Sequence, residues 1–446
     1  MQVGFSYARF IDAGYFVVKT SIQLNRHFVK ERASVHNRLM IGRIKRIYLD
    51  YASATPVHPK AARAYNDASG IFANPGGIHA EGVAAKRALD GARESIAGHL
   101  GCKPRELIFV SGLTEANNIA LLGLARGLEL RKRSLEHTHW IVSSIEHSSV
   151  LECFSEIERM GGTVSYVEPD AKGIIRAEAV HAMLTPETVL VSVGWGNNEI
   201  GTLQPLSSIG HTVRAYGKAH NTTILLHSDA GQAPLYRSPQ VHSLGVDMFS
   251  LGSGKLYGPR GIGCLYISNR ASLHSTVFGG GQERGLRSGT EDVALAVGFA
   301  SALDAVTFER EAESKRLRLL RDTFAASLRQ GFGGQARDLG IVINGDLKHS
   351  LPHMLNISVP GERTGEYIVL ALDHAGVALS TKSACREGEA LSHVVLALGD
   401  GKSAASSVVL TKEERARNTL RFSLGRDTTE KELKRTLAIL EDILPK

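Results

Sequence analysis

The stretch SLGSGKLYGPRG, residues 250–261, places one lysine in a run of glycines and small side chains. The segment Val246–Phe249 precedes it, and the apolar segment Ile262–Ile267 follows it. Both segments are typical of buried strands, so Lys255 is predicted to lie on a tight turn between two core strands. A lysine held in this way can form a Schiff base with a carbonyl compound. An ordinary loop lysine is the alternative, and this stretch alone does not decide between them.

Outward from this stretch, helix and strand patterns alternate from about residue 60 to residue 310. Seven strand-like runs are nearly continuous in apolar residues: 106–110, 140–144, 164–167, 188–193, 223–226, 248–251 and 262–267. Apolar strands separated by helices are typical of a parallel sheet that is covered on both faces. The sequence therefore predicts an α/β fold whose large domain, residues 60–310, is built on a mostly parallel seven-stranded sheet.

A smaller α+β domain is predicted from residues 47–59 together with residues 311–446. A long charged helix is expected near 308–330, after helical stretches that end at about residue 310. Short strands are expected at 340–344, 353–359 and 376–379, with a helix at 365–375 between the last two. A C-terminal helix is expected from Thr429, whose sequence context resembles a capping box.

The net charge of +7 is concentrated at the N-terminus. Residues 1–46 hold nine Lys or Arg against two acidic residues, and the rest of the chain is balanced. Direct nucleic-acid binding is therefore not predicted from charge. Three interpretations of residues 1–46 stay open: a transit-type presequence, a flexible basic arm that is disordered, or an upstream extension of a start at Met40. The last is favoured.

The chain has four cysteines, Cys102, Cys153, Cys264 and Cys385, and no pair has CxxC spacing. Neither a metal site nor a disulfide framework is indicated. The first three lie in apolar helix or strand patterns, as buried cysteines do. No run approaches the ~20 apolar residues that span a bilayer. We expect a cytoplasmic setting without membrane contact.

Polar residues follow several of the predicted strands, at the position where ligands bind in open α/β sheets. SGLTEANN, residues 111–118, opens a helix, so Leu113 and Thr114 lie where free N–H groups can hold a phosphate. His147, in SSIEHSS at 143–149, can lie on a flat heteroaromatic ring and move protons near neutral pH. An ordinary helix cap and an ordinary loop histidine are the alternatives.

Asp229, in HSDAGQ, ends another predicted strand. A carboxylate beside the ring nitrogen keeps the pyridine of pyridoxal phosphate protonated, which makes the ring an electron sink. Asn198, in GNNEIG, and Gln232 can hydrogen-bond the phenolic oxygen of that cofactor. The glycine-rich loop GGGQERGLRSGT, residues 279–290, carries two arginines and suits contact with an anion.

Together and in this order, these motifs resemble those of the pyridoxal-phosphate-dependent cysteine desulfurases, which are class V aminotransferase-like enzymes. The resemblance runs from Tyr48 to about residue 440. It implies the fold-type I architecture, pyridoxal 5'-phosphate as cofactor, and conversion of L-cysteine to L-alanine. Lys255 would hold the cofactor, Ser253 would help to hold its phosphate, and Thr290 would reach the phosphate of a neighbouring subunit. A homodimer is therefore implied.

Two further motifs enter through the resemblance. STKSAC, residues 380–385, matches the loop whose cysteine becomes a persulfide, so Cys385 would take the substrate sulfur. It would pass that sulfur to acceptor proteins, either an iron–sulfur scaffold or thiolation enzymes. LRFSLGR, residues 420–426, carries Arg421, which with Asn198 would bind the substrate carboxylate. Lys382 would favour the thiolate of Cys385.

The position before Lys255 departs from the family pattern, as do Lys382 before the SAC end of its motif and the longer stretch Asp400–Arg417. The family usually has a histidine before the lysine that helps to hold the phosphate, whereas Gly254 stands here. Two other functions are therefore considered. One is a selenocysteine lyase or cysteine sulfinate desulfinase, which would need Cys385 less. The other is a non-catalytic homologue that serves as a scaffold in sulfur-transfer assembly, which Gly254 would favour.

Overall fold

The computed structural model describes residues 46–330, 340–382, 391–403 and 407–444. Residues Ile47–Lys446 group into one compact unit. The interpretations of residues 1–45 and the role of Cys385 fall outside the described residues. Among the described residues, no helix is both long enough and apolar enough to cross a membrane.

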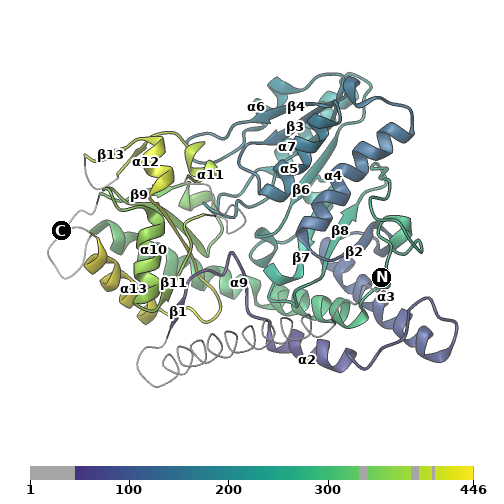
Figure 1. Cartoon of the computed structure of the whole chain (residues 1–446), viewed down its shortest axis with the longest axis horizontal. Helices are drawn as coiled ribbons and strands as arrows, with labels where there is room; N and C mark the ends of the chain where they lie inside the picture. The colour runs from purple at the N-terminus through teal and green to yellow at the C-terminus, as the bar shows by residue number, and fades with distance from the viewer. Residues whose placement is uncertain (1–45, 331–339, 383–390, 404–406, 445–446) are drawn as a thin grey trace, which may run out of the picture. The chain divides into compact units, whose positions relative to one another are not determined.

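A seven-stranded sheet with the strand order β2-β8-β7-β6-β5-β3-β4 forms the centre of the fold (Figure 1). The pairs β4–β3, β3–β5, β5–β6 and β6–β7 are parallel, and β8 runs antiparallel to both of its neighbours. This confirms the predicted α/β fold with a mostly parallel sheet. The strands are β2 (Leu107–Val110), β3 (His139–Ser143), β4 (Thr163–Val167), β5 (Thr188–Ser192), β6 (Leu225–Asp229), β7 (Met248–Gly252) and β8 (Gly263–Ile267).

Two hydrophobic clusters explain why most of these strands are buried on both faces; the edge strand β4 is the exception, with only Val167 fully buried. On β3, Ile141 belongs to one cluster, whereas Trp140 and Val142 belong to the other. Successive side chains of a strand point to opposite faces, so a sheet buried on both sides has no polar face. The clusters include residues of α3 (Ala80–Leu100) and α7 (Leu206–Ala219) on one side, and of α4 (Leu113–Leu130) and α5 (Ser148–Arg159) on the other.

A second set of strands lies in the C-terminal third of the chain and includes β1 (Ile47–Tyr48). The antiparallel order is β14-β10-β9, and β1 pairs in parallel with β11. The strands are β9 (Val342–Asn344), β10 (Met354–Ser358), β11 (Val377–Ala378), β14 (Thr419–Ser423) and the hairpin of β12 (Gly401–Lys402) with β13 (Val409–Leu410). The division into domains at 47–59, 60–310 and 311–446 stays a prediction.

The remaining helices are α2 (Pro59–Ala68), α6 (Ala177–Met183), α8 (Val241–Leu244), α9 (Val293–Gln330), α10 (Gly365–His374), α11 (His393–Leu396), α12 (Lys412–Arg417) and α13 (Glu430–Ile443). The charged helix expected near 308–330 is not separate from the helical stretch that was expected to end at about residue 310. Both belong to one continuous helix, α9. Thr429 caps α13 in a capping box with Glu432. The strand expected at 223–226 begins and ends later, as β6.

Candidate active site

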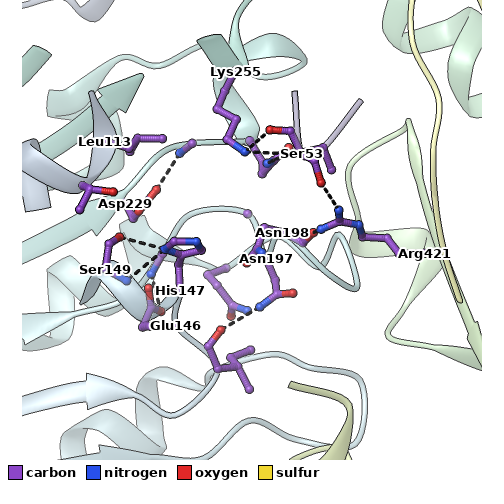
Figure 2. Close-up of a pocket in the computed structure, with 18 residues that line it drawn as sticks. Ser53, Leu113, Glu146, His147, Ser149, Asn197, Asn198, Asp229, Lys255 and Arg421 are labelled. Carbon is purple, nitrogen blue, oxygen red and sulfur yellow. Dashed lines mark hydrogen bonds between the residues drawn. The ribbon is translucent and has the colours of Figure 1, made fainter. Parts of the chain in front are cut away.

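The chain segments that follow five strands meet at one edge of the large sheet. β2 is antiparallel to β8, as β7 is, so β2 runs in the direction of the parallel strands. Ligands bind at the carboxyl ends of such strands. A cavity with about 940 Å³ of empty space, part of it open to solvent, lies there (Figure 2). Its lining includes Ala52, Ser53, Leu113, Thr114, Glu146, His147, Asn197, Asn198, Asp229, Gln232, Lys255 and Arg421.

Lys255 ends a short 3₁₀ turn that follows β7 directly. Its Nζ donates hydrogen bonds to the carbonyl oxygens of Ala52 and Ser53, both at 2.8 Å. Gln232 also donates to the carbonyl oxygen of Ala52, at 2.9 Å. The turn after β1 therefore holds the predicted cofactor lysine, as Figure 2 shows for Ser53.

Asp229 is the last residue of β6, and both of its carboxylate oxygens accept hydrogen bonds. The side-chain nitrogen of Asn117, on α4, donates to Oδ2 at 2.7 Å, and the backbone N–H of Gly231 donates to Oδ1 at 2.8 Å. Since an amide nitrogen and a backbone N–H are donors only, neither oxygen needs a proton of its own. The arrangement suits an ionised carboxylate that faces the cavity.

His147 is the N-cap residue of α5, and its ring accepts a hydrogen bond from the backbone N–H of Ser149. Burial lowers the pKa of His147, while the nearby Asp229 carboxylate acts in the opposite direction and Lys255 adds to the lowering. The ring is therefore neutral in the pH range where an exposed histidine begins to charge.

Glu146, next to His147, was not singled out from the sequence. Its side chain is 5 % exposed, and Oε1 accepts from the backbone N–H of Gly194 at 2.8 Å. Burial raises the pKa of Glu146 to about 8, although the hydrogen bond from Gly194 opposes the shift. A Cβ at residue 194 would lie 2.8 Å from Oε2, so a larger residue there would displace the carboxyl group. Glu146 is therefore a protonated carboxyl group at neutral pH.

Arg421 lies on β14, and its side chain is 1 % exposed. Its NH2 donates to Asp50 Oδ1 at 2.8 Å and to Ser53 Oγ at 2.6 Å, and its NH1 donates to the carbonyl oxygen of Asn198 at 2.9 Å. Its Nε is buried and has no partner among the described residues. The guanidinium is thus fixed at the cavity wall with donor capacity to spare, which suits an anionic group.

The structure brings eight of the predicted site residues together around this cavity: Leu113, Thr114, His147, Asn198, Asp229, Gln232, Lys255 and Arg421. Ser253 does not line it: a Cβ at Gly258 would lie 2.1 Å from Ser253 Oγ, so that hydroxyl packs against Gly258. Thr290 is exposed and also lies off the lining. Cys385 is outside the described residues.

Sequence reasoning missed Asp50, Ser53, Asn117 and Glu146. Two of them stand inside quoted motifs, Asn117 in TEANN and Glu146 in IEHSS, but nothing local marks either as buried against the site. Lys382 was expected to favour the thiolate of Cys385. Its Nζ lies 3.1 Å from Oε1 of Glu366 and forms an ion pair with that carboxylate. Part of its charge is therefore offset.

These side chains fit pyridoxal phosphate. No side chain caps the N-terminus of α4, so the N–H groups of its first turn remain available beside Leu113 and Thr114, where a phosphate would bind. Asp229 supplies a carboxylate and Lys255 a primary amine on the same cavity. The fold and the site together define a fold-type I enzyme that uses pyridoxal phosphate.

Known proteins are similar to this chain in sequence. The aminotransferase class-V family model matches residues 47–436. The chain is 35% identical over 404 residues to a cysteine desulfurase IscS of Dictyoglomus turgidum, covering 90% of this chain and 95% of that protein. It is 38% identical over 395 residues to the cysteine desulfurase IscS of Photorhabdus laumondii, covering 87% and 90%.

Two solved structures agree. A NifS-like protein superposes with a TM-score of 0.78 at 31% identity, covering 90% of this chain and 99% of the other. SspA in complex with cysteine superposes with a TM-score of 0.68 at 32% identity, covering 85% and 98%. The chain therefore belongs to the aminotransferase class-V family and, within it, to the cysteine desulfurases.

Proposed function

We propose that this protein is a pyridoxal-phosphate-dependent cysteine desulfurase that converts L-cysteine to L-alanine and leaves the sulfur on Cys385. The observation that carries the proposal is one cavity lined by Lys255, Asp229 and Arg421. An amine, a carboxylate and a fixed guanidinium are the groups needed to hold this cofactor and an amino acid side by side.

The cofactor, when bound, supplies an electron sink for the carbon skeleton of the amino acid. Lys255 would hold it through its amine, Asp229 would face its ring nitrogen, and His147 would lie against its ring. Leu113 and Thr114, at the start of α4, would hold its phosphate. Asn198 and Gln232 would contact its phenolic oxygen. Ser253, although it lies off the cavity lining, would help to hold the phosphate.

Arg421 would bind the substrate carboxylate, assisted by Asn198. Asp50 and Ser53 already hold NH2, so the guanidinium has one orientation and little side-chain entropy is lost when the substrate arrives. Lys255 would take the α-proton of the substrate, because it is the amine that lines the same cavity.

Sulfur transfer would begin with attack of the Cys385 thiolate on the substrate sulfur. A new S–S bond forms, the Cβ–S bond breaks, and its electron pair stays with the carbon skeleton, which leaves as alanine after protonation. The other thiols are poor nucleophiles, because burial raises the pKa of Cys102 and of Cys153 to about 12 and that of Cys264 still further.

We also propose that the protein is a homodimer in the cytoplasm and hands its sulfur to acceptor proteins of iron–sulfur cluster assembly or thiolation. The exposure of Thr290, away from the cavity of its own chain, supports the dimer. A threonine so placed is available to a phosphate in the site of another copy.

Incubation of the cofactor-loaded protein with L-cysteine tests the proposed activity. Alanine and sulfide should form in the presence of a thiol reductant, and Lys255→Ala should abolish both products. Cys385→Ser separates the related activities, because release of selenide or sulfinate needs the thiol less than release of sulfur from L-cysteine does. Turnover of L-cysteine by Lys255→Ala at the wild-type rate would contradict the proposal.

A further inference from the structure

A chain of hydrogen bonds joins two residues of the cavity that come from different strands. Asp229 Oδ2 accepts from Asn117 Nδ2 at 2.7 Å, and the same nitrogen donates to Ser149 Oγ at 2.9 Å. Ser149 Oγ lies 2.9 Å from His147 Nδ1. Figure 2 shows the contact between Ser149 and His147. We propose that Asn117 is a positioning residue that orients Ser149, whose backbone N–H and hydroxyl together hold His147 as the tautomer with its proton on Nε2.

The first step concerns Nδ1 of His147. The backbone N–H of Ser149 donates to it at 3.1 Å as part of the cap of α5. A backbone N–H can only donate, so Nδ1 must offer a lone pair. A neutral imidazole carries one proton, which therefore resides on Nε2.

The second step concerns the direction of the Ser149 hydroxyl. Asn117 donates to one of the two lone pairs of Ser149 Oγ, and Nδ1, which already accepts from the backbone N–H, has no proton to offer the other, so the hydroxyl donates to Nδ1. The amide of Asn117 cannot be reversed, because its carbonyl oxygen would then face the Asp229 carboxylate. The carboxylate thus sets the amide, the amide holds the Ser149 oxygen, and the hydroxyl and backbone N–H of Ser149 both donate to the ring.

The burial of Asn117 is a separate observation in favour of this role. Its side chain is fully buried, and its Oδ1 has no partner among the described residues. A buried acceptor without a partner is destabilising, so packing alone does not account for an amide here. Both of its N–H bonds are used, one toward each partner, which is the function that an amide and not an apolar side chain provides.

The consequence for the reaction concerns Nε2. His147 lines the cavity, and the described residues give Nε2 no hydrogen-bond partner. The ring therefore presents an N–H donor to the bound molecules and has no lone pair there with which to accept a proton. Asp229, Lys255, Glu199 and His393 are the charged or titratable groups that act on this ring. Lys255 is then left as the base, and His147 serves as a hydrogen-bond donor.

This inference rests on the proposed function, but its test does not require turnover. Full-length holoenzyme with ¹⁵N-labelled histidine is titrated by NMR, and the signals of His147 are those lost in His147→Asn. We expect a protonated Nε2 and an unprotonated Nδ1 at neutral pH. A proton on Nδ1 would overturn the proposal.

Asn117→Leu removes both N–H donors and keeps the number and branching of the side-chain heavy atoms. The Ser149 oxygen then loses the donor that orients it and accepts more readily from a protonated Nδ1, so the titration of His147 should move upward by about one pH unit or more. Asn118→Ala is the matched control, because Asn118 is the next residue of α4 and its amide bonds only the carbonyl of Thr114. An equal shift in both variants, or none in Asn117→Leu, would reject the role of Asn117.

Ser149→Ala repeats the test if Asn117→Leu does not fold, since it deletes only the hydroxyl. One of two donors to Nδ1 is lost, so a smaller upward shift is expected, and no shift would reject the relay. The predicted tautomer without alanine formation would refute only the proposed function. Alanine formation with the proton on Nδ1 would refute only this inference.

Discussion

Gly254 stands where the resemblance leads us to expect a histidine, and the structure leaves room there for a side chain. A Cβ at this position would lie 3.3 Å from Cγ of Arg260, whose side chain is exposed and free to shift. Gly254→His should therefore fold and add a charge-assisted hydrogen bond to the cofactor phosphate. We expect the dissociation constant of pyridoxal phosphate to fall about tenfold or more. Absorbance titration of the apo-protein measures it.

Gly254→Ala is the control for that substitution. It adds the same Cβ without the imidazole, so the affinity for pyridoxal phosphate should stay near that of the wild type. An equal fall in the dissociation constant of pyridoxal phosphate in both variants would show that the gain comes from a restricted backbone and not from a contact with the phosphate.

Glu146 predicts a pH dependence of stability. Its pKa is about 8 in the folded protein, against an ordinary value near 4.5, so the folded state keeps a proton that the unfolded chain loses between these values. Stability from this group is therefore lost as pH rises through that window, by up to about 1.4 kcal/mol per pH unit. Glu146→Gln removes the effect.

Urea denaturation at several pH values measures the difference between Glu146→Gln and the wild type. The free energy of unfolding of the variant, relative to the wild type, should increase from pH 5 to pH 8 and then level off. A constant difference across that range would mean that Glu146 is ionised in the folded protein.

At the residue scale, the sequence predicted the side chains that stand in motifs at strand ends. Lys255, Asp229, His147 and Arg421 all line the cavity. Asn117 was not predicted, because its role depends on contacts with residues 32 and 112 positions away. Asp50 was missed for the same reason, since its partner Arg421 is 371 positions away. Contacts between residues so far apart in the sequence leave no mark on the local sequence pattern.

At the element scale, the residue directly before β10 is a buried histidine that should make the fold acid-sensitive. The ring of His353 packs against Tyr236 at a tilt, with ring centroids 4.5 Å apart, and neither ring nitrogen has a partner among the described residues. Burial lowers the pKa of His353 to about 3. Below about pH 6.5 the unfolded chain therefore binds a proton at His353 that the folded state does not bind. The free energy of unfolding decreases as pH falls toward 3.

His353→Phe keeps the ring and removes the titration. Relative to the wild type, its free energy of unfolding should rise by about 1.4 kcal/mol for each pH unit below 6.5. Denaturation curves at pH 7, 6 and 5 provide the comparison. A parallel decline of both proteins would place the acid sensitivity in other groups.

Elements with a strong apolar pattern were predicted well, and those with a mixed pattern were not. Most strands of the large sheet are buried on both faces because two hydrophobic clusters cover them. The segment of β14 was recognised only as part of the LRFSLGR motif and not as a strand. The buried Arg421 interrupts the run of apolar residues that marks the other strands. α2 was also missed, since it is short and only two of its residues are buried.

At the scale of the whole molecule, the proposed dimer predicts complementation between two defective chains. Lys255→Ala and Thr290→Ala should each impair the protein alone. If Thr290 serves the neighbouring site, mixed dimers contain one site with both residues intact, and turnover should reappear after the two variants are unfolded and refolded together. If each site uses its own Thr290, mixing restores nothing, and the shared site would be wrong.

The most direct test of the account is mass spectrometry of the whole chain after incubation with L-cysteine and without reductant. The peptide that contains Cys385 should gain the mass of one sulfur atom, with alanine released in equal amount. The gain should be absent in Lys255→Ala and reversed by a thiol reductant. Alanine formation with an unmodified Cys385, or sulfur carried on Cys102, Cys153 or Cys264 instead, would contradict the account.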